Sequence, residues 1–181
     1  DLDESSNQPM QSSDEQIFIV FNGEIYNHEY LRKKLERKHT FRTKNSDTEV
    51  IINAYKEWGI NCVDRFVGMF AFAIYDVDNK KVFLARDRLG KKPLYYTVEN
   101  NTLYFSSENQ AFFDAKLKEK IFNEESIYHY LTYLTTPAPN TFYKGIYKLE
   151  AGYYCEISTK HKLEKTQYWN ISDFINKEII S

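Results

Sequence analysis

The chain has 181 residues, 42% of them hydrophobic, which is enough apolar material to bury the core of one ordinary domain. Its 24 basic and 26 acidic residues give a net charge of −2, so no field of one sign is available to attract nucleic acid or an anionic membrane surface. The longest apolar run, Val67 to Tyr75, is far shorter than the ~20 residues that cross a bilayer, and the first residues lack the pattern of a signal peptide. These features predict a soluble, cytoplasmic protein with a small partner and no membrane or nucleic-acid contact.

Two cysteines, Cys62 and Cys155, lie far apart and form neither a disulfide framework nor a zinc-binding spacing. Cys62 could be a nucleophile activated by a histidine, but its apolar neighbours favour a packed, structural thiol. The sequence opens at Asp1, in a polar stretch without periodicity that runs to Glu15. We interpret this opening as the interior of a longer chain.

The first regular element is a short apolar run over Gln16–Phe21 that stops at Asn22-Gly23, a pair that favours turns. This pattern predicts a buried strand that ends in a tight turn. Hydrophobic residues then recur at helical spacing over Glu24–His39 and again over Asp47–Trp58. Two amphipathic helices are therefore predicted after the first strand.

Two apolar hairpins are predicted next. Met69–Asp76 and Lys81–Asp87 are separated by a turn-forming segment, and Leu94–Thr97 and Leu103–Ser106 repeat the design. Two helices followed by consecutive hairpins indicate an α+β fold in which helices cover sheet faces.

The later part of the chain is expected to hold one more helix and one more strand. The helix is predicted over Asn123–Tyr133, and Pro137 and Pro139 interrupt regular structure after it. The strand is predicted near Gly152–Ile157, where it would rejoin the sheet.

Asn22-Gly23 is the first candidate for chemistry. A side-chain amide and a neighbouring backbone N–H can point at one oxygen atom, and a single donor of this kind can be worth about 10²–10³ in rate. The plain alternative is a turn without function, and the dipeptide alone favours that interpretation.

Glu24 and Asp47 are the second candidates, because a pair of carboxylates can hold the ammonium group of an amino acid. Ser46 and Glu49 match a capping box, in which Asp47 would complement the helix dipole. Capping explains Ser46 and Glu49 but does not require Asp47.

Two further segments are interpreted as structural. The loop Ala85–Pro93 carries four basic residues but lacks the glycine spacing of a phosphate-binding loop, so a turn with a solvated charge cluster is favoured. Asp76–Asn79 superficially suggests a calcium loop, but Lys80 and Lys81 replace the glycine turn and further ligands. No metal site is predicted.

Five segments, in order, resemble the glutaminase domain of glutamine-hydrolysing asparagine synthetases, a class II glutamine amidotransferase. One such segment would be a weak signal, whereas five in order are specific, and the resemblance covers roughly Gln8 to Trp169. The segments are Phe21–Asn27, Ser46–Val50, Gly68–Ala73, Ala85–Gly90 and Pro93–Tyr96.

The resemblance implies an N-terminal nucleophile hydrolase fold, a four-layer αββα sandwich of antiparallel sheets, in which a cysteine at residue one attacks the glutamine side-chain amide. By position, Asn22 and the N–H of Gly23 resemble the oxyanion hole, and Glu24 and Asp47 resemble the carboxylates that hold the α-ammonium group. The sequence has no cysteine at its start, so we expect an incomplete fold that is inactive, and unstable, by itself.

The same resemblance implies the organisation of a longer enzyme. Residues 1–170 would be a partial amidotransferase domain, with an inter-domain connector from about residue 120, and 171–181 would begin a linker to a missing synthetase domain. Expected partners are L-glutamine and that synthetase domain, which would use ATP and magnesium; no cofactor is expected in this domain, and a homodimer stays open. The alternatives are an amidotransferase that serves another acceptor, such as a sugar, and a non-catalytic glutamine-binding scaffold.

Overall fold

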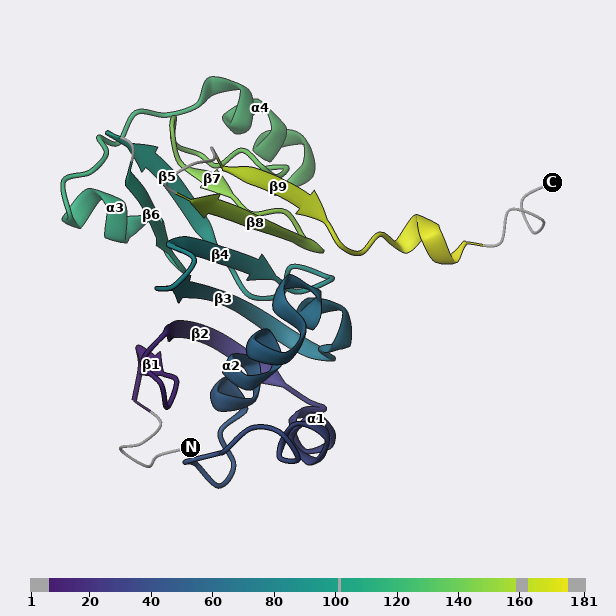
Figure 1. Ribbon diagram of the computed structural model, residues 1–181. Helices are drawn as coiled ribbons and strands as arrows, with labels where there is room; N and C mark the ends of the chain where they lie inside the picture. The colour runs from purple at the N-terminus through teal and green to yellow at the C-terminus, as the bar shows by residue number, and fades with distance from the viewer. Residues whose placement is uncertain (1–6, 101, 159–162, 176–181) are drawn as a thin grey trace.

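The computed structural model describes residues 7–100, 102–158 and 163–175. The described strands form two antiparallel sheets (Figure 1). The larger sheet has the order β1 (Met10–Gln11), β2 (Ile17–Ile25), β3 (Gly68–Asp76), β4 (Lys81–Arg86), β8 (Tyr153–Ser158) and β9 (Glu164–Gln167). The smaller sheet has the order β6 (Thr102–Ser106), β5 (Tyr95–Glu99) and β7 (Tyr147–Lys148).

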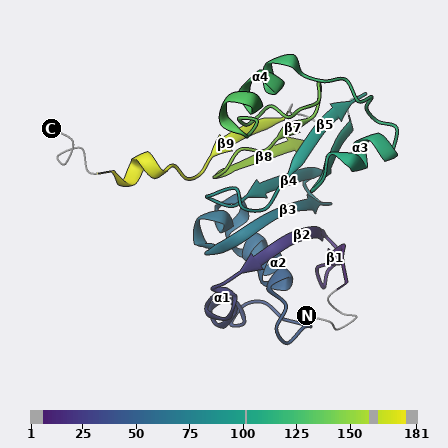
Figure 2. The same cartoon turned by 180° about the vertical axis from the view of Figure 1, so that it is seen from behind.

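Helices α1 (His28–Leu35) and α2 (Asp47–Trp58) lie on one face of the larger sheet, and Figure 2 shows the same sheet from its other face. A 3₁₀ segment, Gly59–Arg65, follows α2. Helices α3 (Gln110–Asp114) and α4 (Glu124–Tyr133) lie beside the smaller sheet, and a short 3₁₀ turn, Ile171–Phe174, follows β9 (Figure 1).

Side chains on β3 show how the layers are held together. Phe70 and Phe72 point toward the helices and belong to the larger core cluster, together with residues of α1 and α2. Ala71 and Ala73 point to the opposite face of the sheet. There they pack in a second cluster with Leu94, the residue just before strand β5 of the smaller sheet. Because successive side chains of a strand alternate between faces, large residues fill the helix side and small ones let the two sheets approach. The predicted α+β class with antiparallel sheets is confirmed.

Most predicted elements are found where the sequence indicates. The strands of both hairpins pair antiparallel, α2 spans Asp47–Trp58 as predicted, and α4 lies within the predicted helix. The strand predicted near 152–157 is β8, which pairs with β4 and so rejoins the larger sheet.

The predicted turn at Asn22-Gly23 is wrong. Strand β2 continues through these residues to Ile25, with Gly23 opposite Phe70 of β3, and helix α1 begins only at His28. Gly23 has φ of +148°, a value that favours glycine, so its backbone freedom serves a distorted strand rather than a turn.

The prediction that the charged residues of Ala85–Pro93 are solvated is also wrong for Arg86 and Asp87. Arg86 donates to the carbonyls of Gly90, Lys92 and Leu149 at 2.6, 2.7 and 2.7 Å, and burial lowers its pKa. Asp87 is 1% exposed and accepts hydrogen bonds from the backbone of its own loop and from Phe70. Polar groups taken out of water need such partners, and the loop supplies them.

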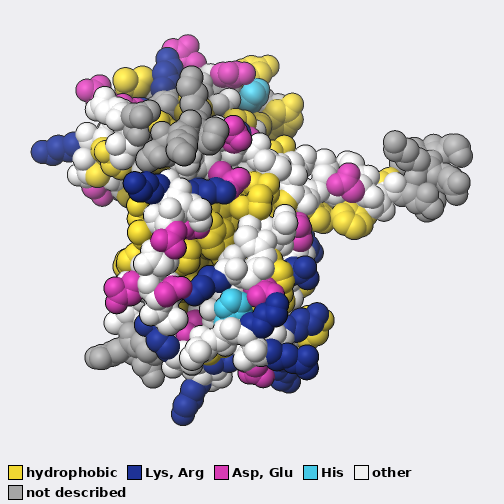
Figure 3. All heavy atoms as spheres, in the orientation of Figure 1, with side chains coloured by type: hydrophobic (Ala, Val, Ile, Leu, Met, Phe, Trp, Pro, Cys, Tyr) yellow, Lys and Arg dark blue, Asp and Glu magenta, His cyan; other side chains and the backbone are white. Residues whose placement is uncertain are grey.

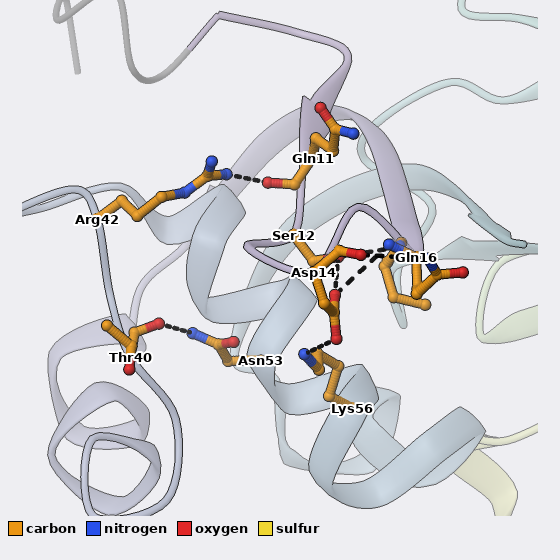
Figure 4. Close-up of polar contacts among 9 residues, drawn as sticks. Gln11, Ser12, Asp14, Gln16, Thr40, Arg42, Asn53 and Lys56 are labelled. Carbon is orange, nitrogen blue, oxygen red and sulfur yellow. Dashed lines mark hydrogen bonds and ion pairs between the residues drawn. The ribbon is translucent and has the colours of Figure 1, made fainter. Parts of the chain in front are cut away.

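The segment before β2 is fixed against α2 (Figure 4). Lys56 of α2 pairs with Asp14 at 2.6 Å, and the hydroxyl of Ser12 donates to the same carboxylate at 2.6 Å. Arg42 donates to the carbonyl of Gln11. The contacts of Gln11, Ser12 and Asp14 thus hold the short strand β1 in place, although the sequence around it has no periodicity.

None of the helices in the described ranges is both long enough and apolar enough to span a bilayer.

Candidate functional site

The final residues of β2 present an open backbone edge. Phe21 donates its N–H to the carboxamide oxygen of Gln8 at 2.6 Å and accepts from its nitrogen at 2.9 Å, while the N–H of Ile25 donates to Asp47 Oδ2 at 3.0 Å. In an antiparallel strand, the polar groups of every second residue point to the same side. The N–H of Gly23 is therefore directed to this same edge, between the groups that bind Gln8 and Asp47.

Gly23 is also the point where β2 and β3 come very close together. A Cβ at Gly23 would lie 2.1 Å from the carbonyl oxygen of Met69 and 2.8 Å from Cα of Phe70. Since no side chain fits at those distances, this position requires glycine for reasons of space as well as of φ. A backbone N–H fixed in this way is a preorganised donor.

Asn22 lies next to this edge and lines a cavity of about 210 Å³. The cavity wall is mainly apolar on the side of β2 and β3, where Val20, Ala71 and Ala73 contribute, and Ser106 and Ser107 close it from β6 and the loop that follows. Because successive side chains of a strand point to opposite faces, Asn22 and Glu24 lie on the same face of β2, the one turned away from the helices.

Asp47 reaches the edge from the start of α2. The capping box predicted for Ser46 and Glu49 is wrong, because Ser46 makes no side-chain cap hydrogen bond. Glu49 is 5% exposed and instead accepts from the N–H of Arg42 at 2.7 Å and the N–H of Thr43 at 2.8 Å. Helix capping therefore does not account for Asp47, whose carboxylate is held at the end of β2.

The structure thus brings the four predicted site residues together along one strand end. Asn22, Gly23 and Glu24 are consecutive on β2, and Asp47 is bonded to the residue that follows them. Sequence reasoning missed Gln8, which binds the backbone of Phe21 and lines the cavity beside Asn22. Nothing in the polar stretch around Gln8 marks it, because its role arises only from its approach to β2.

Neither cysteine lies at this site. Cys62 is 0% exposed and Cys155 1% exposed, and burial raises the pKa of both thiols, that of Cys155 to about 12. The prediction that Cys62 is a packed, structural thiol is confirmed, and both cysteines are free. Within the described parts of the chain, no group of three or more His, Cys, Asp or Glu side chains could hold a metal ion.

A fold of stacked antiparallel sheets with backbone and amide donors on one strand end is suited to stabilising the oxyanion of an amide hydrolysis. Sequence comparison agrees: this chain belongs to the glutamine amidotransferase domain family, whose profile matches residues 1–169. Its similarity extends to asparagine synthetase [glutamine-hydrolyzing] 2 of Bacillus subtilis, 37% identical over 177 residues, covering 94% of this chain and 23% of the relative. It is also similar to amidase chyE of Penicillium rubens, 33% identical over 180 residues, covering 94% of this chain and 25% of that protein.

Solved structures support the fold. Glutamine phosphoribosylpyrophosphate amidotransferase from B. subtilis superposes with a TM-score of 0.66 at 19% identity, covering 93% of this chain and 33% of that one. The chain therefore has the fold of the N-terminal nucleophile hydrolase amidotransferases, as the resemblance implied. It spans less than a third of the length of the curated relatives that it matches.

Proposed function

We propose that this chain is the glutamine-binding part of a cytoplasmic, glutamine-hydrolysing asparagine synthetase. In the complete enzyme, L-glutamine would be hydrolysed here, and the ammonia would pass to a synthetase domain that converts aspartate to asparagine with ATP and magnesium. The observation that carries the proposal is the convergence of Asn22, Gly23, Glu24 and Asp47 on one strand end, in a chain 37% identical to such an enzyme.

Each residue has a distinct role in this proposal. When a thiolate attacks the side-chain amide of glutamine, the carbonyl oxygen becomes an oxyanion, and the amide of Asn22 and the N–H of Gly23 would donate to it. Collapse of this intermediate releases ammonia and leaves a thioester, which water hydrolyses to glutamate. Glu24 and Asp47 would hold the α-ammonium group of the substrate through charge-assisted hydrogen bonds.

This chain alone is proposed to be inactive. The attack requires a thiol near the oxyanion donors, but both cysteines of the sequence are buried in the core with raised pKa values. A complete protein would supply the nucleophile from a residue outside these 181.

A second candidate is an amidotransferase that serves another acceptor. The similarity to amidase chyE favours this candidate, because it covers 94% of this chain, the same share as the similarity to asparagine synthetase 2 of B. subtilis. The site described above binds only the nitrogen donor, so the acceptor has to be determined by activity.

The test uses the full-length protein and an Asp47→Ala variant, with glutamate release and synthesis from free ammonia measured side by side. The proposal expects loss of glutamine-dependent turnover and retention of ammonia-supported asparagine formation. Asp78→Ala, an exposed carboxylate in the β3–β4 turn, is the matched control and should behave as the wild type. Unchanged glutamine hydrolysis in Asp47→Ala would show that Asp47 does not bind substrate.

A further inference from the structure

The outer edge of strand β2, the edge turned away from β3, is covered by another strand only near its beginning. Strand β1 pairs with β2 at Phe18 and Ile19, and no described strand continues along that edge (Figure 1). Because the backbone groups of successive residues point to opposite edges, Phe21, Gly23 and Ile25 direct their N–H and C=O groups to the uncovered part. Such groups need other partners or stay available to a ligand.

Side chains take the place of a neighbouring strand at two of these three residues. The carboxamide of Gln8 accepts from the N–H of Phe21 at 2.6 Å and donates to its carbonyl at 2.9 Å. We call this pair of hydrogen bonds the Gln8 clamp. Two residues beyond Gly23, the N–H of Ile25 donates to Asp47 Oδ2 at 3.0 Å. Gly23 lies midway between these contacts.

The direction of the Gly23 N–H depends on its neighbours more than on Gly23 itself. Gly23 has φ of +148°, and glycine restricts its own dihedral angles less than any other residue. A donor that stabilises an oxyanion must nevertheless point at one place. Two hydrogen bonds to Phe21 fix both the position and the tilt of the backbone just before Gly23, which a single bond would not do. The Gln8 clamp therefore supplies part of the restraint that glycine lacks.

The clamp also offsets an unfavourable dipole. Along the outer edge of β2, the C=O of Phe21 and the N–H of Gly23 are neighbours. An oxyanion held by Gly23 would lie near the negative end of that carbonyl, which accepts from Nε2 of Gln8 at 2.9 Å. The net charge of the chain is −2, and Figure 3 shows basic and acidic side chains interspersed over one face, so no field of one sign replaces such local donors.

Gln8 borders the space in which the reaction is proposed. Its side chain lines the cavity of about 210 Å³ together with Phe21 and Asn22. The carbonyl that Gln8 binds belongs to the peptide group joining Phe21 to Asn22, so the clamp acts directly on the backbone that carries the Asn22 side chain. Both proposed oxyanion donors thus follow the clamp within two residues.

We propose that Gln8 is a positioning residue for the oxyanion donors Asn22 and Gly23, acting through the backbone of Phe21. The inference rests on the proposed function, in which these donors stabilise the oxyanion. Its effect belongs to the transition state rather than to the binding of glutamine. Since a misplacement of about 1 Å can cost on the order of 10²-fold in rate, loss of the clamp should lower kcat and leave KM nearly unchanged.

The first test is Gln8→Met in the full-length protein, which removes both hydrogen bonds and keeps an unbranched side chain. We expect kcat for glutamine hydrolysis to fall by about 10–100-fold, with KM within about twofold of wild type. Gln110→Met is the matched control, because Gln110 is also exposed and its carboxamide bonds Asp114 and Lys120, far from β2 in sequence. It should leave both constants unchanged, and an unchanged kcat in Gln8→Met would overturn the proposal.

A second variant and a pair of inhibitors exclude a purely structural role. Gln8→Glu can still accept from Phe21 but cannot donate to its carbonyl, so its kcat should fall at least as far as that of Gln8→Met. The aldehyde analogue of glutamine, to which a thiol adds to form an oxyanion-like adduct, should bind Gln8→Met at least about tenfold more weakly than wild type. The affinity for glutamate should be unchanged, and equal weakening of both ligands would overturn the proposal.

Amide hydrogen exchange of the full-length protein separates this inference from the proposed function. The amide of Phe21 should exchange about fivefold to tenfold faster in Gln8→Met than in wild type, because one hydrogen bond is lost, whether or not glutamine is hydrolysed. Equal exchange rates would overturn the clamp. Faster exchange in the variant of a protein whose wild type has no glutaminase activity would contradict the proposed function alone.

Discussion

The carboxylate of Asp47 accepts the backbone N–H of Ile25 at 3.0 Å, so the first residue of α2 is bonded to the last residue of β2. This bond holds the carboxylate at the end of β2, and it needs only an acceptor oxygen. Binding of an ammonium group, by contrast, needs the negative charge. The two roles of Asp47 can therefore be separated by a single substitution.

Asp47→Asn keeps an oxygen that can accept from Ile25 but removes the charge. We expect the free energy of unfolding of the full-length protein to change by less than about 1 kcal/mol, because the hydrogen bond survives. The KM for glutamine should rise by about tenfold or more, the equivalent of one charge-assisted hydrogen bond. Steady-state kinetics with glutamine and with free ammonia measure this, and an unchanged KM would contradict the role of the charge.

Gly23→Ala should disrupt the strand pair as well as the oxyanion donor. The new methyl group would meet the carbonyl oxygen of Met69 at 2.1 Å, and φ of +148° is itself unfavourable for alanine. Strain and overpacking together are expected to lower the unfolding free energy by about 2–5 kcal/mol.

Gly59→Ala is the matched control for that variant, because Gly59 also has positive φ, +59°, but nothing lies within 4 Å of its added Cβ. It should cost about 1–3 kcal/mol in urea unfolding, the backbone strain alone, because its ψ of −141° lies outside the left-handed helical region. Equal losses for the two variants would show that close approach of β2 and β3 is not what restricts Gly23.

Strands and helices that depend on contacts between residues close in sequence could be predicted. Features that depend on contacts between residues far apart in sequence could not. The β3–β4 hairpin follows from local turn chemistry, and Asp76 indeed accepts the N–H of Asn79 at 3.0 Å. The same local reasoning fails at Asn22-Gly23, because pairing with Phe70 and Ala71, more than forty residues later, keeps these residues in a strand.

The candidate site shows the same division. Residue type and position drew attention to Asn22, Gly23, Glu24 and Asp47, whereas Gln8 became visible only through its two bonds to Phe21. The charged loop Ala85–Pro93 was predicted to be solvated, because nothing local indicates that the carbonyl of Leu149, 63 residues from Arg86, accepts a hydrogen bond from its guanidinium group.

Asp87→Ala is expected to be among the most destabilising substitutions in this domain. It would leave the N–H groups of Phe70, Leu89, Lys91 and Lys92, now bonded at 3.0–3.2 Å, without their acceptor. We expect a loss of about 3 kcal/mol or more, since one buried and three partly buried donors would lose their acceptor together. Urea unfolding followed by circular dichroism tests this, and a loss as small as that of the exposed control Asp78→Ala would contradict it.

The Asp14–Lys56 pair should make a small, pH-dependent contribution to stability. Its hydrogen bond with Lys56, and next that with Ser12, hold the pKa of Asp14 well below its usual value. A carboxyl whose folded pKa is lowered stabilises the protein above its unfolded pKa of about 3.9, and this stabilisation is lost as the pH falls toward the folded value.

The difference in unfolding free energy between wild type and Lys56→Met should therefore be present at about pH 7 and shrink toward about pH 3. It should not exceed about 1 kcal/mol, because the Asp14 side chain is 48% exposed. A difference that grows on acidification would contradict the assigned sign.

Strand β8 lies between β4 and β9, and β7 pairs with β5, so segments from late in the chain complete both sheets. Recombining this amidotransferase domain with a foreign acceptor domain requires that this arrangement be kept. A crossover near residue 120 would replace the partners of β4 and β5 with unrelated sequence and leave two sheet edges unpaired. A fusion junction that keeps the domain intact lies after Trp169. The backbone N–H groups of Tyr168 and Trp169 donate to the carbonyl of Gly152 and so attach this last segment to the end of the larger sheet.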